Sequence, residues 1–332
     1  MAERLRAARF KLILISAIAA AAALAGVLLD AYWIGVLSQA LMMGLAAVAL
    51  DVLVGWAGMP SLGSAAFFGV AGYTVAIMTT RWDISPWLAA VLGIVLGLLL
   101  ASGFAPLAVR THGLAFLTVT LAFGQVIWGL ATKWYGVTGG SDGIAGVPRP
   151  EALFGLSLYD PKVFYVFTII VVAVFVGLLL WVMGSPFGLQ LRGVRLSELR
   201  LRSLGYNSTR LRMAAFVLSA GLVSVAGVMF TFFNQFVGTN AVDWRLSAQM
   251  LLAVIVGGPG KIWGPFVAGC GLFFIQVFAT NLTDRWTLIL GLLYIGAVLF
   301  LPTGFAGLFK RKGGPIHGGG VTEADMELEV RT

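Results

Sequence analysis

The run VFYVFTIIVVAVFVGLLLWVMGSPFGLQL occupies residues 163–191 and contains no charged side chain. A helix that crosses a membrane needs about 20 mainly apolar residues, and uncharged runs of that length recur at 213–242 and 262–283. Only 11% of the 332 residues are charged, whereas soluble domains carry about 25%. With a mean hydropathy of +0.96, the composition excludes a water-soluble globular protein.

The uncharged runs predict an all-α polytopic membrane protein with ten membrane-spanning helices. We expect them near residues 12–29, 34–54, 65–80, 86–109, 114–133, 162–183, 213–236, 246–257, 264–280 and 286–302. The eighth run is short for a hydrocarbon core of about 30 Å, so it needs help from a neighbouring loop. The first run follows four basic residues as a signal peptide does, but its length and the later spans favour a retained helix.

An even number of spans with both termini in the cytoplasm places sixteen of the 22 lysines and arginines on the inner side. That distribution obeys the positive-inside rule. It gives a cytoplasmic N-terminus (1–11), a transmembrane domain (12–309), an outer loop (134–160), an inner loop (184–212) and a tail (310–332). The tail is glycine-rich and then acidic, and we expect it to be disordered. Trp244 and Arg245 are expected at the outer end of the eighth span.

Several classes of function find no support in the residues. The net charge of +8 follows the topology and is not accompanied by an aromatic and basic surface, so we expect no nucleic-acid partner. Cys270 is the one cysteine and lies in an apolar run, while His112 and His317 are far apart in the chain. We therefore expect no metal site, no cofactor bound by this chain and no catalytic set, and hence no enzyme.

Asp51 is the only charged residue between Ile34 and Thr80, and a helix-breaking segment follows it. A carboxylate inside a span usually faces a bundle interior or a water-filled path, so Asp51 indicates a pathway or hinge; alternatively it reaches water at the helix end. A second break contains a lysine but lacks the residues of a phosphate-binding loop, and the residues by themselves favour a tight turn between two helices. The expected break residues are Gly55, Gly58, Pro60, Gly63, Gly257, Gly258, Pro259 and Gly260.

The inner loop 184–212 contains six arginines and a single acidic residue, Glu198. Its apolar residues do not fall on one helical stripe, as they would in a helix lying on lipid. Docking onto another protein explains this pattern. An arginine-rich loop that only fixes the topology explains it equally well.

Several ordered motifs carry a family resemblance. GWAG (55–58) with SLGSAAFFG (61–69) is followed by TVTLAFG (118–124), TGGSDGI (138–144), GGPGKIWGP (257–265) and LPTGFAG (301–307). From about residue 34 to 309 the chain resembles the branched-chain amino-acid permeases of prokaryotic ABC importers, and the LivM-like subunit more than the LivH-like one. FGLQLRGVR (187–195) with LGYN (204–207) resembles the cytoplasmic coupling helix of that family.

The resemblance implies a permease subunit that translocates branched-chain amino acids, or a related small polar, carboxylate or amide solute, across the bacterial inner membrane. It implies four kinds of partner: a LivH-like permease subunit, two ATP-binding subunits that hold ATP and Mg²⁺, an extracytoplasmic substrate-binding protein, and the lipid bilayer. The expected coupling residues are Arg192, Val194, Arg195, Leu196, Glu198, Leu199, Leu201 and Leu204. The expected pathway residues are Asp51, Ser61, Ser64, Phe67, Thr118, Thr120 and Gln125.

Three departures from the family pattern bear on these assignments. Ser64 replaces a frequent histidine, Asp51 stands where asparagine is common, and Leu196 and Ser197 replace polar residues of the coupling helix. The rival hypothesis is a secondary transporter driven by an ion gradient, with Asp51 as a proton or cation site between broken helices.

Overall fold

The computed structural model describes residues 30–151, 157–282 and 291. The first expected span and both terminal segments lie outside these ranges, and so does the tenth expected span apart from residue 291. Each of the other eight expected spans contains a helix in the structure, so the all-α prediction is confirmed. These helices are α2 (Ala31–Asp51), α3 (Ser64–Arg81), α4 (Pro86–Ala108), α5 (Leu114–Lys133), α7 (Pro161–Gly184), α10 (Ser208–Asn234), α11 (Trp244–Gly257) and α12 (Trp263–Leu282).

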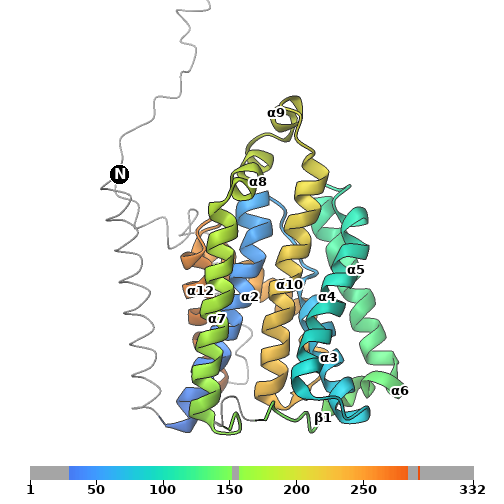
Figure 1. Ribbon diagram of the computed structural model, residues 1–332, viewed down its shortest axis with the longest axis vertical. Coiled ribbons are helices and arrows are strands. Elements are labelled where there is room, and N and C mark those ends of the chain that lie inside the picture. The colour runs from blue at the N-terminus through green and yellow to red at the C-terminus, as the bar shows by residue number, and fades with distance from the viewer. Residues whose placement is uncertain (1–29, 152–156, 283–290, 292–332) are drawn as a thin grey trace, which may run out of the picture.

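Short elements mark the two ends of the helix bundle (Figure 1). At one end, which we call the α9 end, lie α8 (Pro186–Leu196) and α9 (Glu198–Ser203). The opposite end is called the β1 end, after strand β1 (Ile144–Ala145), which pairs antiparallel with β2 (Phe236–Val237). The remaining short elements are η1 (Val52–Ala57), α6 (Tyr135–Thr138), η2 (Gly140–Asp142) and η3 (Thr239–Val242).

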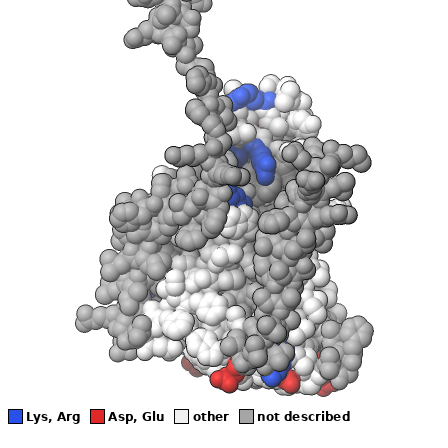
Figure 2. Space-filling view, turned by 90° about the vertical axis from the view of Figure 1, so that its left-hand side faces the viewer, with Lys and Arg blue, Asp and Glu red and all other residues white. Residues whose placement is uncertain are grey.

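The surface has the pattern of a membrane protein. Among the described residues, six helical segments are long and apolar enough to span a bilayer, and large apolar side chains such as Leu99 and Val174 are exposed on their outer faces. Figure 2 shows charged side chains near both ends of the molecule, while the described residues between them on that face are uncharged. An apolar surface of this extent is stable against lipid rather than water. The chain is therefore a multi-pass membrane protein.

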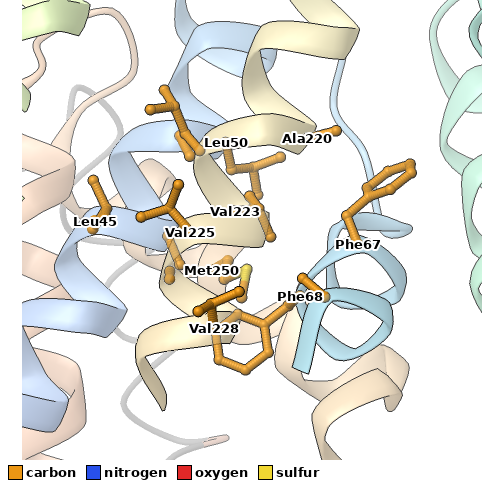
Figure 3. Close-up of a cluster of buried hydrophobic side chains, with 14 of the residues drawn as sticks. Leu45, Leu50, Phe67, Phe68, Ala220, Val223, Val225, Val228 and Met250 are labelled. Carbon is orange, nitrogen blue, oxygen red and sulfur yellow. The ribbon is translucent and has the colours of Figure 1, made fainter. Parts of the chain in front are cut away.

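Helix α10 is the centre of the core and packs against α2, α3 and α4. Figure 3 shows Phe67 and Phe68 of α3 beside Val223 and Val228 of α10, with Leu50 of α2 close by. Small residues bring the backbones together: a Cβ atom at Gly93 would lie 2.8 Å from the carbonyl oxygen of Ala71. Helix α10 begins at Ser208, inside the expected inner loop. The Asn207 side chain caps this helix by accepting a hydrogen bond from Arg210 N at 3.0 Å.

Helices α3 and α11 both begin inside the bundle. Ala65 N, in the first turn of α3, donates to Ser247 Oγ in the first turn of α11 at 2.8 Å. Close by, Ser224 Oγ donates to Phe67 O at 3.4 Å. Ser224 lies ten residues before Asn234, the end of α10 at the β1 end, which corresponds to about 15 Å of helix. That distance is half of a hydrocarbon core of about 30 Å.

The starting depth of α11 corrects one expectation. Trp244 and Arg245 do not lie at the outer end of a span, because the chain between α10 and α11 descends along α3 before α11 begins. A Cβ atom at Gly69 of α3 would lie 3.1 Å from Ala241 C in η3. The preceding loop therefore completes the short eighth span.

Candidate functional site

Three segments singled out by the sequence meet at one point near the α9 end, which we call the junction. They are Asp51 with the following η1, the loop between α11 and α12 around Gly260, and helix α8. Asp51 is 0% exposed, and its Oδ1 accepts a hydrogen bond from Gly260 N at 2.8 Å. Its Oδ2 has no hydrogen-bond partner among the described residues. The alternative in which Asp51 reaches water at the helix end is therefore wrong.

Element η1 is a π-helix, a wider coil that often marks a functional site. It contains Gly55, where a Cβ atom would overlap Gly260 N and Asp51 Oδ1 and lie 2.7 Å from Gly260 Cα. The coil ends at Gly58, whose φ of 71° is in the left-handed region, and Met59 N donates to Leu53 O at 2.8 Å. Glycine at residue 55 thus lets the two helix breaks touch.

Helix α8 contacts the junction through two arginines that lie one turn apart. Arg195 Nη1 donates a hydrogen bond to Gly55 O, and the Arg195 Cγ atom would be 3.1 Å from a Cβ at Gly58. The Arg192 guanidinium lies 4.1 Å from the centre of the Trp56 ring, which is a cation–π contact. Because both contacts are made to η1, any displacement of α8 acts directly on the end of α2.

Glu198, the first residue of α9, organises a second set of contacts. Its Oε1 accepts hydrogen bonds from Ser208 Oγ at 2.8 Å and Arg202 Nη2 at 2.6 Å, and its Oε2 lies 3.9 Å from Arg212 Nη1. Partial burial alone would raise the pKa of this carboxyl. The hydrogen bond from Ser208, the charge of Arg212, the contact with His112 and the charge of Arg202 outweigh burial and hold the pKa below its usual value.

Arg212, in the first turns of α10, is only 3% exposed. It donates to Thr111 O at 2.6 Å and to the Met59 sulfur at 3.0 Å, and its Nη1 is 2.7 Å from His112 Nε2. The same His112 Nε2 atom lies 3.1 Å from Glu198 Oε2, so the imidazole is placed between the guanidinium and the carboxylate. Arg212 therefore joins α10 to the turn between α4 and α5 and to the loop after η1.

The sequence did not identify this role of Arg212. Its position directly before an uncharged run of 30 residues, 213–242, is also what a simple topology-fixing arginine would show. The residues that bond to Arg212 lie about 100 and 150 residues away in the sequence. No local pattern could therefore indicate its burial or its three partners.

The apolar members of the expected coupling residues divide into two groups. Val194 and Leu201 are buried, while Leu196, Leu199 and Leu204 are 82%, 81% and 73% exposed. The segment is two helices rather than one, because Ser197 ends α8 and its side chain caps α9. This division explains why the apolar residues do not form one stripe.

The expected pathway residues are not brought together at one place. Ser61, Ser64, Phe67 and Thr120 are buried near the start of α3, Thr118 and Gln125 lie on α5, and Asp51 is at the junction. Two of the hydroxyls bind backbone: Thr120 Oγ1 accepts from Leu62 N at 3.1 Å and Ser61 Oγ accepts from Gly63 N at 3.2 Å. The structure thus gives Thr120 and Ser61 a packing role. The part of all seven expected residues in a pathway stays a prediction.

Comparison with known proteins identifies the family. Residues 32–301 match the family described as the permease component of branched-chain amino-acid transport systems. Among curated proteins, the chain is 29% identical to the LivM high-affinity branched-chain amino-acid permease proteins of Salmonella typhimurium and of Escherichia coli, in both cases over 77% of this chain and 65% of the relative.

A third relative is a probable LivH branched-chain amino-acid permease protein of Methanocaldococcus jannaschii, 23% identical over 76% of this chain and 85% of the relative. The chain spans 65% of the length of the two LivM proteins. No solved structure matches. Because the family match covers most of the chain, this protein belongs to the branched-chain amino-acid transport system permease family.

Proposed function

We propose that this chain is one permease subunit of an ATP-driven importer in the bacterial inner membrane. A homologous LivH-like permease subunit completes the path, two separate subunits bind and hydrolyse ATP with Mg²⁺, and an extracytoplasmic binding protein delivers the substrate. The chain itself performs no covalent chemistry. Family membership and the names of the relatives support this assignment. They also support a substrate that is a branched-chain amino acid or a related small polar, carboxylate or amide solute.

The α9 end faces the cytoplasm in this proposal. The positive-inside rule supports this orientation, because the arginine-rich segment of α8 and α9 lies at that end. The N-terminus, the tail and both helix breaks then lie on or toward the cytoplasmic side.

The exposed leucines of α8 and α9 are the docking surface for an ATP-binding subunit. Leu196, Leu199 and Leu204 lie at the α9 end, where no other described residue covers them. Large apolar side chains exposed to water in this way are typical of protein interfaces. The buried Leu201 of α9 packs against α8, where a Cβ atom at Gly193 would lie 3.0 Å from its Cδ1 atom.

The observation that carries the mechanism is the contact between α8 and η1. When ATP binding moves the docked subunits, α8 moves with them, and Arg195 and Arg192 transmit that movement to Gly55 and Trp56. The break at Gly260 moves with them because Asp51 binds its amide. The junction thereby switches the path between outward and inward access, a change between two packed states.

The test is to express the chain with its genomic neighbours, purify the complex, and measure ATP hydrolysis and ATP-driven uptake into proteoliposomes with and without the binding protein. Arg195→Ala removes a hydrogen bond to a charged donor, worth about 1.5–3 kcal/mol. We expect the complex to assemble and hydrolyse ATP, while uptake falls by roughly tenfold or more.

Arg200→Ala is the matched control, since it removes a guanidinium from the neighbouring helix without touching η1. It should leave uptake unchanged. Uptake by this chain alone, driven by a pH or sodium gradient and abolished by Asp51→Asn, would instead make it a secondary transporter and refute the proposal.

A further inference from the structure

The start of α11 places a charged pair inside the membrane. Asp243 caps the helix by accepting a hydrogen bond from Arg245 N at 2.9 Å. Both residues lie within one helical turn of Ser247, which binds the first turn of α3 about halfway through the bundle. The Arg245 side chain is nevertheless 75% exposed on the surface of this chain.

An exposed guanidinium at that depth needs a polar environment from outside the described part of the chain. Charged side chains within a membrane face a water-filled path or a partner group, because contact with lipid is costly. Within the described residues, the only ion pair of Arg245 is with Asp243, at 3.6 Å between Nη1 and Oδ2. A guanidinium has five donors in a planar fork, so most of its hydrogen-bonding capacity remains available to a ligand.

Two amide side chains lie on α11 and α12, in the lining of a hollow that Arg245 itself does not line. Gln249 is one turn further along α11, on the side of the helix that carries Arg245. Together with Gln276 of α12 it lines a hollow of about 20 Å³, whose other walls are apolar. The apolar lining consists of Met43, Leu246, Met250, Ala253, Gly269, Leu272 and Phe273. The hollow holds no more than one water molecule, so a solute would need the space between this face and the second permease subunit.

We propose that Arg245 binds the carboxylate of the transported solute at mid-membrane. The inference rests on the proposed importer function and adds to it the residue that recognises the solute inside the path. A guanidinium binds a carboxylate through two parallel hydrogen bonds. Gln249 and Gln276 offer further polar contacts, and the apolar side chains around them accept an aliphatic or aromatic side chain. Asp243 holds the guanidinium loosely while the path is empty.

The competing occupant is an acidic residue of the second permease subunit, which would bury Arg245 permanently. Cysteine accessibility distinguishes the two. Arg245→Cys is prepared in a Cys270→Ser background, assembled with all subunits in proteoliposomes, and treated with the membrane-impermeant anion MTSES in the nucleotide-free and ATP-bound states. Val267→Cys is the control, because Val267 lies on α12, is 58% exposed and does not line the hollow.

We expect MTSES to modify the cysteine at position 245 in at least one state, and at least tenfold faster than the one at position 267. Modification restricted to the control, or absent at position 245 in both states, would overturn the proposal in favour of the subunit interface. This result does not depend on knowing the substrate.

Uptake supplies the second measurement. With L-leucine and L-leucinamide as probes, Arg245→Gln should lower L-leucine uptake at least tenfold relative to L-leucinamide, and Arg245→Lys should restore part of it. Equal effects on both probes, or wild-type uptake of the amide without the acid, would refute carboxylate recognition. Both variants should retain ATP hydrolysis. Failure of the wild-type complex to assemble or to hydrolyse ATP would count against the importer function itself, not against carboxylate recognition.

Discussion

Replacing Gly55 by alanine tests the junction most directly. The new methyl group would overlap Asp51 Oδ1 and Gly260 N, the two atoms that form the buried hydrogen bond between α2 and the second break. Leaving a buried hydrogen-bonding group without its partner costs about 1–3 kcal/mol, and overpacking a core costs a further 1–3 kcal/mol or so. We expect Gly55→Ala to lower the free energy of unfolding by about 3 kcal/mol or more.

The assay is thermal unfolding of the purified complex in detergent, followed by tryptophan fluorescence, together with uptake in proteoliposomes. The matched control is Gly103→Ala in α4, because nothing lies within 4 Å of a Cβ at that residue. Alanine there should be neutral or stabilise the helix by up to about 1 kcal/mol. If Gly55→Ala unfolds at the same temperature as the unsubstituted protein and transports normally, the close packing at the junction is not what holds the two breaks together.

Three further predictions concern other contacts. Ser247→Ala leaves the buried Ala65 N–H without its acceptor and should destabilise the protein by about 1–3 kcal/mol in chemical unfolding; Ser38→Ala, which removes only a bond within its own helix, should change far less. The depressed pKa of Glu198 stabilises the α9 end fully above the unfolded pKa of about 4.3, and this stability is lost as pH falls through the lower folded pKa. Glu198→Gln should therefore flatten the acid side of the curve of melting temperature against pH. Leu199→Asp, at a side chain 81% exposed, should leave the fold intact but abolish co-purification of the ATP-binding subunits.

The sequence predicted the helical elements well because membrane spans depend on a local property. Each of the eight expected spans within the described ranges contains a helix, and the breaks after Asp51 and after Gly257 fall where glycine and proline cluster. The depth in the membrane at which each helix starts was harder to predict. Hydropathy cannot distinguish a short span that starts at the surface from α11, which starts beside the first turn of α3.

The contacts of the site could be predicted only in part. Asp51, Gly55, Gly260 and Arg195 were each identified from composition or resemblance, but their meeting depends on the packing of segments up to 209 residues apart. Arg212 and Arg245 looked like ordinary topology-fixing arginines, because a sequence records their charge but not their burial or depth. Ser61 and Thr120, expected to line a pathway, accept hydrogen bonds from backbone amides, which no sequence pattern indicated.

The shared starting depth of α3 and α11 has an electrical consequence. Each helix N-terminus carries the equivalent of roughly half a positive charge, and here two of them begin beside one another in the middle of the bundle. Protons and alkali cations would meet a repulsive potential at that depth, whereas a solute with a negative group would not. A path opened along this face could therefore translocate the solute without dissipating the proton and sodium gradients across the membrane.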